Sequence, residues 1–222
     1  MSRVHNHIIG QGQRRHEQAS RSFWLSDSEG PCISALDARA QQRACAQAPQ
    51  QVSAPELIEV AAWGGQPTPT ALPAQHIHQL TLHHQGSPWA ADADPAAYLR
   101  RLQQWSQLTQ RWADIPYHFV IAPDGRIYTA RPIALPGATN TEYDPKGHAL
   151  VMLLGNFEHQ TPTPAAIDSS VALLAWLAQQ HGLGPEHIGS HRDFSQQTLC
   201  PGANLQALLP AIRQAVKTRL RP

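Results

Sequence analysis

A continuous apolar run near the middle of the chain constrains its fold most strongly. Residues 148–157 read HALVMLLGNF and lack the alternation of polar and apolar side chains expected of a strand with one face in water. Such a run is typical of a central strand that is buried on both faces. Helices or loops must then pack against each face of the sheet, so the sequence predicts a layered domain built around this strand.

The segment before this run predicts a strand followed by a helix. Side chains alternate in HIHQLTLHHQGSPW, which begins at His76, and Gly86 and Pro88 end the strand. Asp94 is a suitable N-cap, and Pro95 suits the first position of a helix. This helix carries large apolar side chains at helical spacing, which we expect to pack in the core: Tyr98, Leu102, Trp105 and Trp112.

Further signals complete the order of the elements. The turn residues Asp124–Gly125 lie between two short apolar stretches and predict a hairpin. Thr163 caps a second helix that ends near Gly182. A last helix spans residues 204–220, in which Pro210 is expected to cause a kink or to separate the first turn. This order predicts an α/β (α+β) fold with a central mixed β-sheet flanked by helices.

The first part of the chain differs in composition from the rest. Residues 1–54 are rich in Gln, Arg, Ser and Ala and show weak periodicity, so we expect an N-terminal extension with a short helix around residues 35–46. Residues 55–222 are expected to form the folded domain. Cys32 and Cys45 are close enough in sequence to form a disulfide in an oxidising compartment, and two free thiols are the alternative.

Charge and hydropathy argue against two classes of protein, namely nucleic-acid-binding proteins and proteins with a transmembrane helix. The formal net charge is +1 and charged residues make up 15% of the chain, so no basic excess favours nucleic acid. No apolar run approaches the roughly 18 residues of a transmembrane helix. The N-terminal residues also lack the apolar region of a signal peptide. We therefore expect a chain that is cytoplasmic, already processed, assigned a wrong start, or exported by a route without such a signal.

Four segments occur in the order and spacing of a known enzyme family. They read LTLHHQGS, YHFVIAPDGRIYTARP, HALVMLLGNFEHQTPTPAAID and SHRDFSQQTLCPG. Together they resemble the zinc-dependent N-acetylmuramoyl-L-alanine amidases of amidase type 2, which are similar in fold to peptidoglycan recognition proteins and phage amidases. The resemblance runs from about Trp63 to about Leu209 and leaves out residues 1–54. It implies Zn²⁺ as cofactor.

The resemblance implies three zinc ligands that lie far apart in the sequence. They are His83, His191 of the HRD segment and Cys200, which precedes Pro201–Gly202. Two imidazoles, one thiolate and an open position for water are the arrangement of a catalytic zinc site. Successive side chains of a regular strand point to opposite faces, so only one residue of the pair His83 and His84 is expected to bind the metal.

The resemblance also implies residues beside the metal. Tyr117 matches a tyrosine that orients the attacking water or hydrogen-bonds the oxyanion, and Thr198 matches a position that stabilises the oxyanion. Strand alternation turns His118 away from Tyr117. The residues expected to contact the substrate are His84, Trp89, His118 and Asn156.

Two positions depart from the family pattern. Met152 stands where one amidase branch has a glutamate that acts as general base, so Tyr117 is expected to contribute more. Thr139 stands where a histidine is usual in a loop that lines the substrate groove. His148 is a candidate to replace this missing histidine in the groove, and an ordinary surface position is the alternative.

The resemblance implies hydrolysis of the amide between N-acetylmuramic acid and L-alanine in peptidoglycan or muropeptides of bacterial cell walls. Recognition proteins that bind without cleaving have usually lost the cysteine, so Cys200 favours an enzyme over a non-catalytic peptidoglycan-binding module. A third hypothesis is a secreted antibacterial effector, which would have an immunity protein as partner. A cell-wall substrate implies a periplasmic or extracellular location, and the sequence carries no signal for an oligomeric state.

Overall fold

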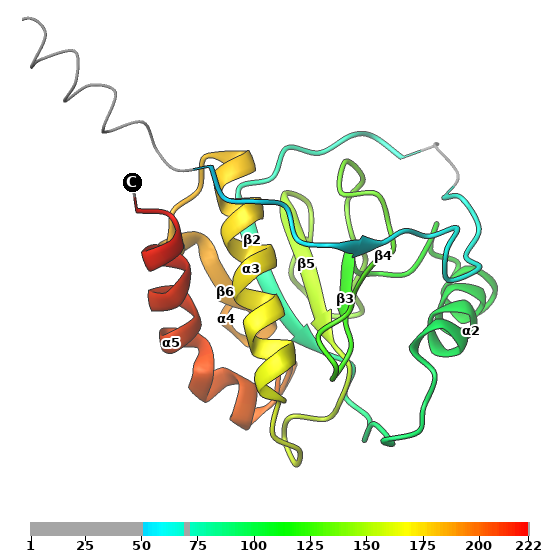
Figure 1. The fold of residues 1–222 in the computed structure, drawn as a ribbon. Helices are drawn as coiled ribbons and strands as arrows, with labels where there is room; N and C mark the ends of the chain where they lie inside the picture. Colours follow the sequence, from blue (N-terminus) through cyan, green and yellow to red (C-terminus); the bar gives the residue numbers. More distant parts are fainter. Residues whose placement is uncertain (1–50, 69–71, 222) are drawn as a thin grey trace, which may run out of the picture. The chain divides into compact units, whose positions relative to one another are not determined.

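The computed structural model describes residues 51–68 and 72–221 of the chain. Within them, six strands form one sheet in the order β1-β4-β3-β5-β2-β6 (Figure 1). The strands are β1 Leu57–Ile58, β2 Gln79–His84, β3 Phe119–Ile121, β4 Ile127–Thr129, β5 His148–Leu153 and β6 Ile188–Ser190. The helices are α2 Pro95–Leu108, α3 Pro164–His181, the 3-10 helix η1 Pro185–His187, α4 His191–Phe194 and α5 Ala203–Arg219.

The apolar run forms the centre of this sheet. Strand β5 lies between β3 and β2 and pairs in parallel with both. Strand β2 also pairs in parallel with β6, whereas β3 and β4 form the only antiparallel pair among the described strands. Every residue of β5 is buried, because both faces of the strand are covered. The predicted fold class, a central mixed sheet flanked by helices, is confirmed.

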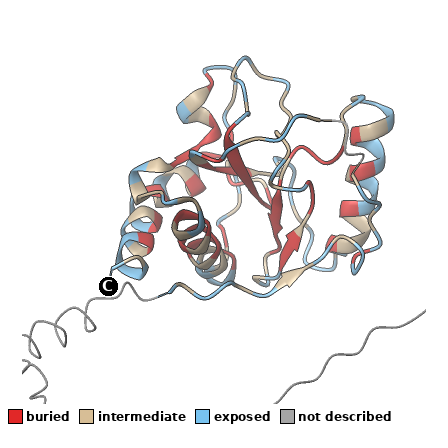
Figure 2. Cartoon of the chain, turned by 90° about the horizontal axis from the view of Figure 1, so that it is seen from above, coloured by how far each residue is buried: buried red, intermediate tan, exposed pale blue. Residues whose placement is uncertain are grey.

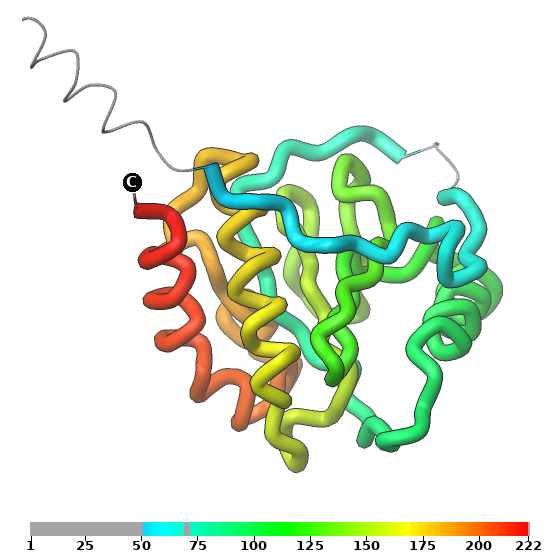
Figure 3. The backbone as a smooth tube through the Cα atoms, in the orientation of Figure 1, coloured from blue at the N-terminus to red at the C-terminus, as the bar shows by residue number. Residues whose placement is uncertain are grey.

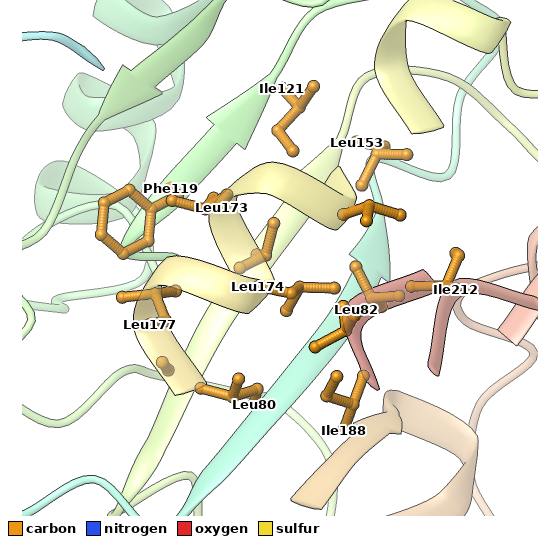
Figure 4. Packing of buried hydrophobic residues seen from close by; sticks show 14 of the residues in the cluster. Leu80, Leu82, Phe119, Ile121, Leu153, Leu173, Leu174, Leu177, Ile188 and Ile212 are labelled. Carbon is orange, nitrogen blue, oxygen red and sulfur yellow. The ribbon is translucent and has the colours of Figure 1, made fainter. Parts of the chain in front are cut away.

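Helices α3 and α5 cover one face of the sheet. Leu82 of β2 and Leu153 of β5 lie in one apolar cluster with Leu174 of α3 and Ile212 of α5 (Figure 4). None of these four side chains is more than 1% exposed. Burial of each such side chain contributes about 2 kcal/mol, so this cluster gives β2 a rigid support on one side.

A second apolar cluster lies on the opposite face, beneath α2. Trp63, Leu99 of α2 and Met152 of β5 belong to it. Strands β2 to β6 are buried along most of their length, whereas helices α2 and α5 combine buried and exposed residues (Figure 2). The α3–α5 face is closed by apolar side chains, while a groove remains between α2 and the ends of β2 and β5.

The helix ends follow the predicted capping signals. Asp94 caps α2 by accepting the backbone N–H of Ala96 at 2.9 Å, and Thr163 caps α3 in the same way. Gly182 ends α3 in the left-handed conformation, with φ 65°. Helix α5 is one continuous helix that contains Pro210, so its first turn is not a separate element.

The sequence analysis predicted that the apolar side chains of α2 pack in the core, and this holds for Tyr98 and Leu102, which are partly buried against the cluster beneath α2. Leu99 and Gln103 point inward, and Gln103 donates to the buried carboxylate of Asp114 at 2.9 Å. Trp105 is 43% exposed and meets Trp112 edge-on, with ring centroids 6.0 Å apart. The groove is bordered by Tyr98, Leu102 and Trp105 of α2 and by Trp112, which follows the helix.

Most of the predicted extension, residues 1–54, lies outside the described residues. The helix expected at residues 35–46 and the pair Cys32 and Cys45 lie outside them as well. The first described residues run beside the end of α5 (Figure 3). Among the described residues, no helix has the length and hydropathy needed to cross a membrane.

Candidate metal centre

Strand β2 turns its last two histidines in opposite directions. His83 is 2% exposed, and its ring centroid lies 5.0 Å from that of Tyr117 on the α2 face. His84 points to the other face, where its Nδ1 accepts the backbone N–H of Phe157 at 3.2 Å. Of these two histidines, only His83 borders the groove.

The register between β2 and β6 brings His191 beside His83. Leu82 pairs with Ser190, and His191 begins α4 directly after Ser190. The two imidazole centroids lie 4.7 Å apart. Pairing of the two strands therefore brings together histidines that are distant in the sequence.

Arg192 holds the cysteine segment against α4. Its backbone N–H donates to the carbonyl of Cys200 at 2.9 Å, and its guanidinium Nη2 donates to the carbonyl of Leu199 at 2.7 Å. The hydroxyl oxygen of Thr198 accepts the backbone N–H of Cys200 at 3.0 Å. The backbone of Cys200 is thus fixed on both sides, with its sulfur directed toward His83.

The three expected ligands form one compact cluster. One nitrogen of His83, one nitrogen of His191 and the Sγ of Cys200 all lie within 4.8 Å of one another. The Nδ1 of His83 is 3.6 Å from the sulfur, and tetrahedral zinc with bonds of about 2.0 Å to nitrogen and about 2.3 Å to sulfur gives nearly the same separation. The Nε2 of His83 is buried without a hydrogen-bond partner among the described residues. The donor types, their spacing and their burial therefore fit a zinc ion.

Protonation states in the cluster are set mainly by burial. Burial lowers the pKa of His83 well below its ordinary value and that of His191 to about 4, so both rings are neutral at pH 7. Burial raises the pKa of the Cys200 thiol to about 12, so a metal must displace its proton on binding. The backbone N–H of His84 donates to the sulfur at 3.4 Å, a contact that favours the thiolate.

The cluster borders a groove of about 400 Å³ on the α2 face. Tyr117 lines this groove, and burial together with the nearby Cys200 raises its pKa well above the ordinary value. The phenol therefore keeps its proton at neutral pH and acts as a hydrogen-bond donor. Met152 also lines the groove, and none of the described lining residues is an aspartate or a glutamate.

His118 has both ring nitrogens engaged inside the fold. Its Nδ1 accepts the backbone N–H of Leu150 at 2.8 Å, and its Nε2 lies 2.9 Å from the carbonyl oxygen of Leu135. These two bonds fix the proton on Nε2, which donates to that carbonyl. The residue links β3, β5 and the loop after β4, and it does not line the groove.

The other residues expected to contact substrate also lie away from the ligand cluster. Trp89 packs edge-on against Tyr98, with centroids 5.4 Å apart, and borders a separate pocket. Asn156 lies in the loop after β5, where its side-chain oxygen accepts the backbone N–H of Glu158. Neither residue lines the groove, and His84 does not line it either. Their role in substrate binding stays a prediction.

Two residues beside the ligands were absent from the sequence-based site. The hydroxyl oxygen of Thr141 lies 2.9 Å from Nε2 of His191. Tyr143 packs its ring 5.1 Å from the same histidine, and its buried hydroxyl has no hydrogen-bond partner among the described residues. Both belong to the loop between β4 and β5, which has no periodic pattern that could have indicated them.

Comparison with known families identifies the family to which the chain belongs. A family model described as N-acetylmuramoyl-L-alanine amidase matches residues 73–203, which is more than half of the chain. The chain belongs to this amidase family. The matched region contains the complete ligand cluster of His83, His191 and Cys200.

Curated relatives of this amidase-family chain carry two kinds of name. Peptidoglycan-recognition protein SC2 of Drosophila melanogaster is 30% identical over 165 residues, which cover 72% of this chain and 86% of the relative. The N-acetylmuramoyl-L-alanine amidase of Homo sapiens is 32% identical over 170 residues, which cover 71% of this chain and 29% of the human protein. The family relationship therefore includes both recognition proteins and amidases.

Solved structures of both kinds share the fold. The Drosophila peptidoglycan recognition protein SD matches with a TM-score of 0.62 at 27% identity and covers 71% of this chain and 94% of its own. The endolysin amidase LysCS from Clostridium intestinale matches with a TM-score of 0.57 at 24% identity, covering 69% and 91% of the two chains. The second likeness supports the fold alone.

Proposed function

We propose that this amidase-family chain is a zinc-dependent N-acetylmuramoyl-L-alanine amidase. It hydrolyses the amide between the lactyl group of N-acetylmuramic acid and L-alanine in peptidoglycan or soluble muropeptides. The observation that carries the proposal is the cluster of His83, His191 and Cys200 at the groove. Binding alone requires a groove, whereas three zinc-type ligands beside that groove serve a hydrolytic reaction.

The three ligands would hold Zn²⁺ through two neutral imidazoles and one thiolate, with an open position for water. When bound, zinc polarises the scissile carbonyl and makes water at the open position more acidic. Arg192 and Thr198 hold the backbone of Cys200, so the sulfur keeps its place whether or not substrate is present. This preorganisation limits the reorganisation that the reaction requires.

Tyr117 gives the reaction a fixed hydrogen-bond donor. Its ring lies beside His83, and its phenol stays protonated at neutral pH. A donor at this place stabilises the negative charge that develops on the carbonyl oxygen during attack by water. Thr198 accepts the backbone N–H of Cys200 and thereby holds the ligand segment. It does not line the groove, so its contribution to oxyanion stabilisation stays a prediction.

Digestion of muropeptides tests the proposal. Zinc-loaded protein should release free stem peptides that begin with L-alanine, as detected by liquid chromatography and mass spectrometry. Dialysis against a strong chelator should abolish the release, and added zinc should restore it. Absence of stem-peptide release by zinc-loaded protein, from both intact sacculi and soluble muropeptides, would overturn the proposal.

A second candidate function is peptidoglycan binding without cleavage. One observation favours it, namely that none of the described residues lining the groove offers a carboxylate as general base. One similar solved structure holds tracheal cytotoxin bound to the ectodomains of the recognition proteins LCa and LCx. Co-sedimentation with sacculi and no released peptide would favour binding over hydrolysis.

A cell-wall substrate locates the proposed activity in the periplasm or outside the cell. An exported antibacterial effector would perform the same hydrolysis on the wall of another cell and would be paired with an immunity protein. The chemistry of the ligand cluster is the same in both settings, so the amidase assay precedes any test of the biological role.

A further inference from the structure

The loop between β4 and β5 is hydrogen-bonded to one of the expected metal ligands. The hydroxyl oxygen of Thr141 lies 2.9 Å from Nε2 of His191. This is the only hydrogen bond to that ring within residues 51–68 and 72–221. The rings of His83 and Tyr143 pack against the same imidazole, but these ring contacts do not decide which nitrogen carries its proton.

A second threonine gives the Thr141 hydroxyl another hydrogen-bond partner. The hydroxyl oxygen of Thr139 lies 2.8 Å from that of Thr141 and also accepts the backbone N–H of Thr141 at 3.1 Å. The Thr141 hydroxyl therefore has a second partner besides His191, to which it can donate its proton. With the hydroxyl proton donated to Thr139, the lone pairs of Thr141 face His191, where they can accept a proton carried by Nε2 and leave the lone pair of Nδ1 free.

We propose that Thr141 is a positioning residue that fixes His191 as a metal ligand. It accepts the N–H at Nε2 and thereby leaves Nδ1 unprotonated for the metal. The inference rests on the zinc site of the proposed function. Metal-bound histidines generally donate their second ring N–H to a nearby acceptor, and loss of that acceptor weakens metal binding about 10- to 100-fold.

The same two threonines line the groove. The wall against which a substrate would lie therefore shares one hydrogen-bond chain with a metal ligand, from Thr139 through Thr141 to His191. This arrangement gives Thr141 a role in the site although it contacts neither the sulfur of Cys200 nor the ring of His83 through any hydrogen bond.

Zinc affinity, measured by competition with a chromophoric chelator, tests the proposal in the intact chain. Valine is close to threonine in shape but lacks the hydroxyl, so Thr141→Val should raise the zinc Kd about tenfold or more. Thr141→Ser restores the acceptor and should stay within about threefold of the wild-type Kd. Thr218→Val removes a hydroxyl that bonds within α5 and should leave the Kd unchanged.

Thermal unfolding of the zinc-free proteins separates positioning from folding. We expect equal melting temperatures for the zinc-free wild type and Thr141→Val. If the valine variant melts lower, the serine variant remains the decisive comparison. A valine variant that binds zinc as tightly as wild type, or a serine variant that binds as weakly as valine, overturns the role of Thr141. Wild-type protein that binds no zinc overturns the proposed function instead.

Discussion

Two of the three ligands are already in the protonation state that binds a metal, and the third is not. The rings of His83 and His191 are neutral at pH 7, because burial keeps the pKa of each well below neutrality. The thiol of Cys200 is still protonated, because burial raises its pKa to about 12. Only the thiolate binds zinc, so binding of the metal is linked to release of one proton.

Zinc affinity should therefore rise with pH. As pH falls, protons compete with zinc for the Cys200 sulfur, and affinity is lost. Between about pH 6 and about pH 9 the histidines are already neutral, so each pH unit should raise the apparent association constant about tenfold. Chelator competition at several pH values gives this slope. A slope near zero would show that no thiol proton is displaced.

Tyr117→Phe should lower kcat for muropeptide hydrolysis by about a hundredfold or more, because the variant loses a donor to the developing oxyanion. Zinc content should stay unchanged, since the phenol is not a ligand. Tyr128→Phe is a matched control, because Tyr128 lies on β4 and does not line the groove. Steady-state kinetics and elemental analysis provide both readouts. An unchanged kcat would remove Tyr117 from the proposed chemistry.

At the scale of single residues, the sequence predicted the features that depend on local backbone geometry. Strand alternation separated His83 from His84, because the two-residue repeat of a strand holds wherever the strand is regular. The contact of Thr141 with His191 was not predicted, because it depends on how an irregular loop folds against α4. His118 was assigned to the substrate, whereas its nitrogens bond to groups on other elements that only the register reveals.

At the scale of elements, the register of β5, β2 and β6 positions the site. The pairing of Leu82 with Ser190 sets the two histidines side by side, and α4 begins at that point. The run at residues 148–157 predicted a central buried strand correctly, because composition alone marks burial on both faces. The core packing predicted for α2 holds for Tyr98 and Leu102 but not for Trp105, which is 43% exposed. The buried bond between Gln103 and Asp114 was not predicted, because a periodic apolar pattern does not indicate polar contacts.

Protonation of His118 in acid should lower the free energy of unfolding. Burial lowers its pKa from an ordinary value of 6.5 to about 4, so the folded state binds fewer protons than the unfolded state. Its contribution is fully present above about pH 6.5 and is lost as pH falls toward about 4, by about 3 kcal/mol in total.

Urea unfolding of the zinc-free protein at pH 7 and pH 5 measures this effect. His118→Gln lacks the titrating ring, so its free energy of unfolding should fall less between the two pH values than that of the wild type. His159→Gln, at an exposed position, should behave like the wild type. Equal pH dependence in His118→Gln and wild type would contradict the assignment.

At the scale of the whole molecule, the fold does not depend on the metal for its core. One apolar cluster lies under α3 and α5, and another lies under α2. The ligands lie at the edge of the α2 face, beside the groove. Removal of zinc should therefore stop hydrolysis without unfolding the chain. Relatives named as recognition proteins and relatives named as amidases share the family, so the architecture alone does not decide the function.

Zinc content after dialysis against zinc-free buffer, measured by elemental analysis, tests the central claim most directly. The wild type should retain about one zinc per chain, and Cys200→Ser should retain far less, because serine is a poor ligand for zinc. His84→Gln should keep the wild-type content, since His84 faces away from the cluster. A wild type without zinc, or a Cys200→Ser variant with full occupancy, would contradict a metal centre built from His83, His191 and Cys200.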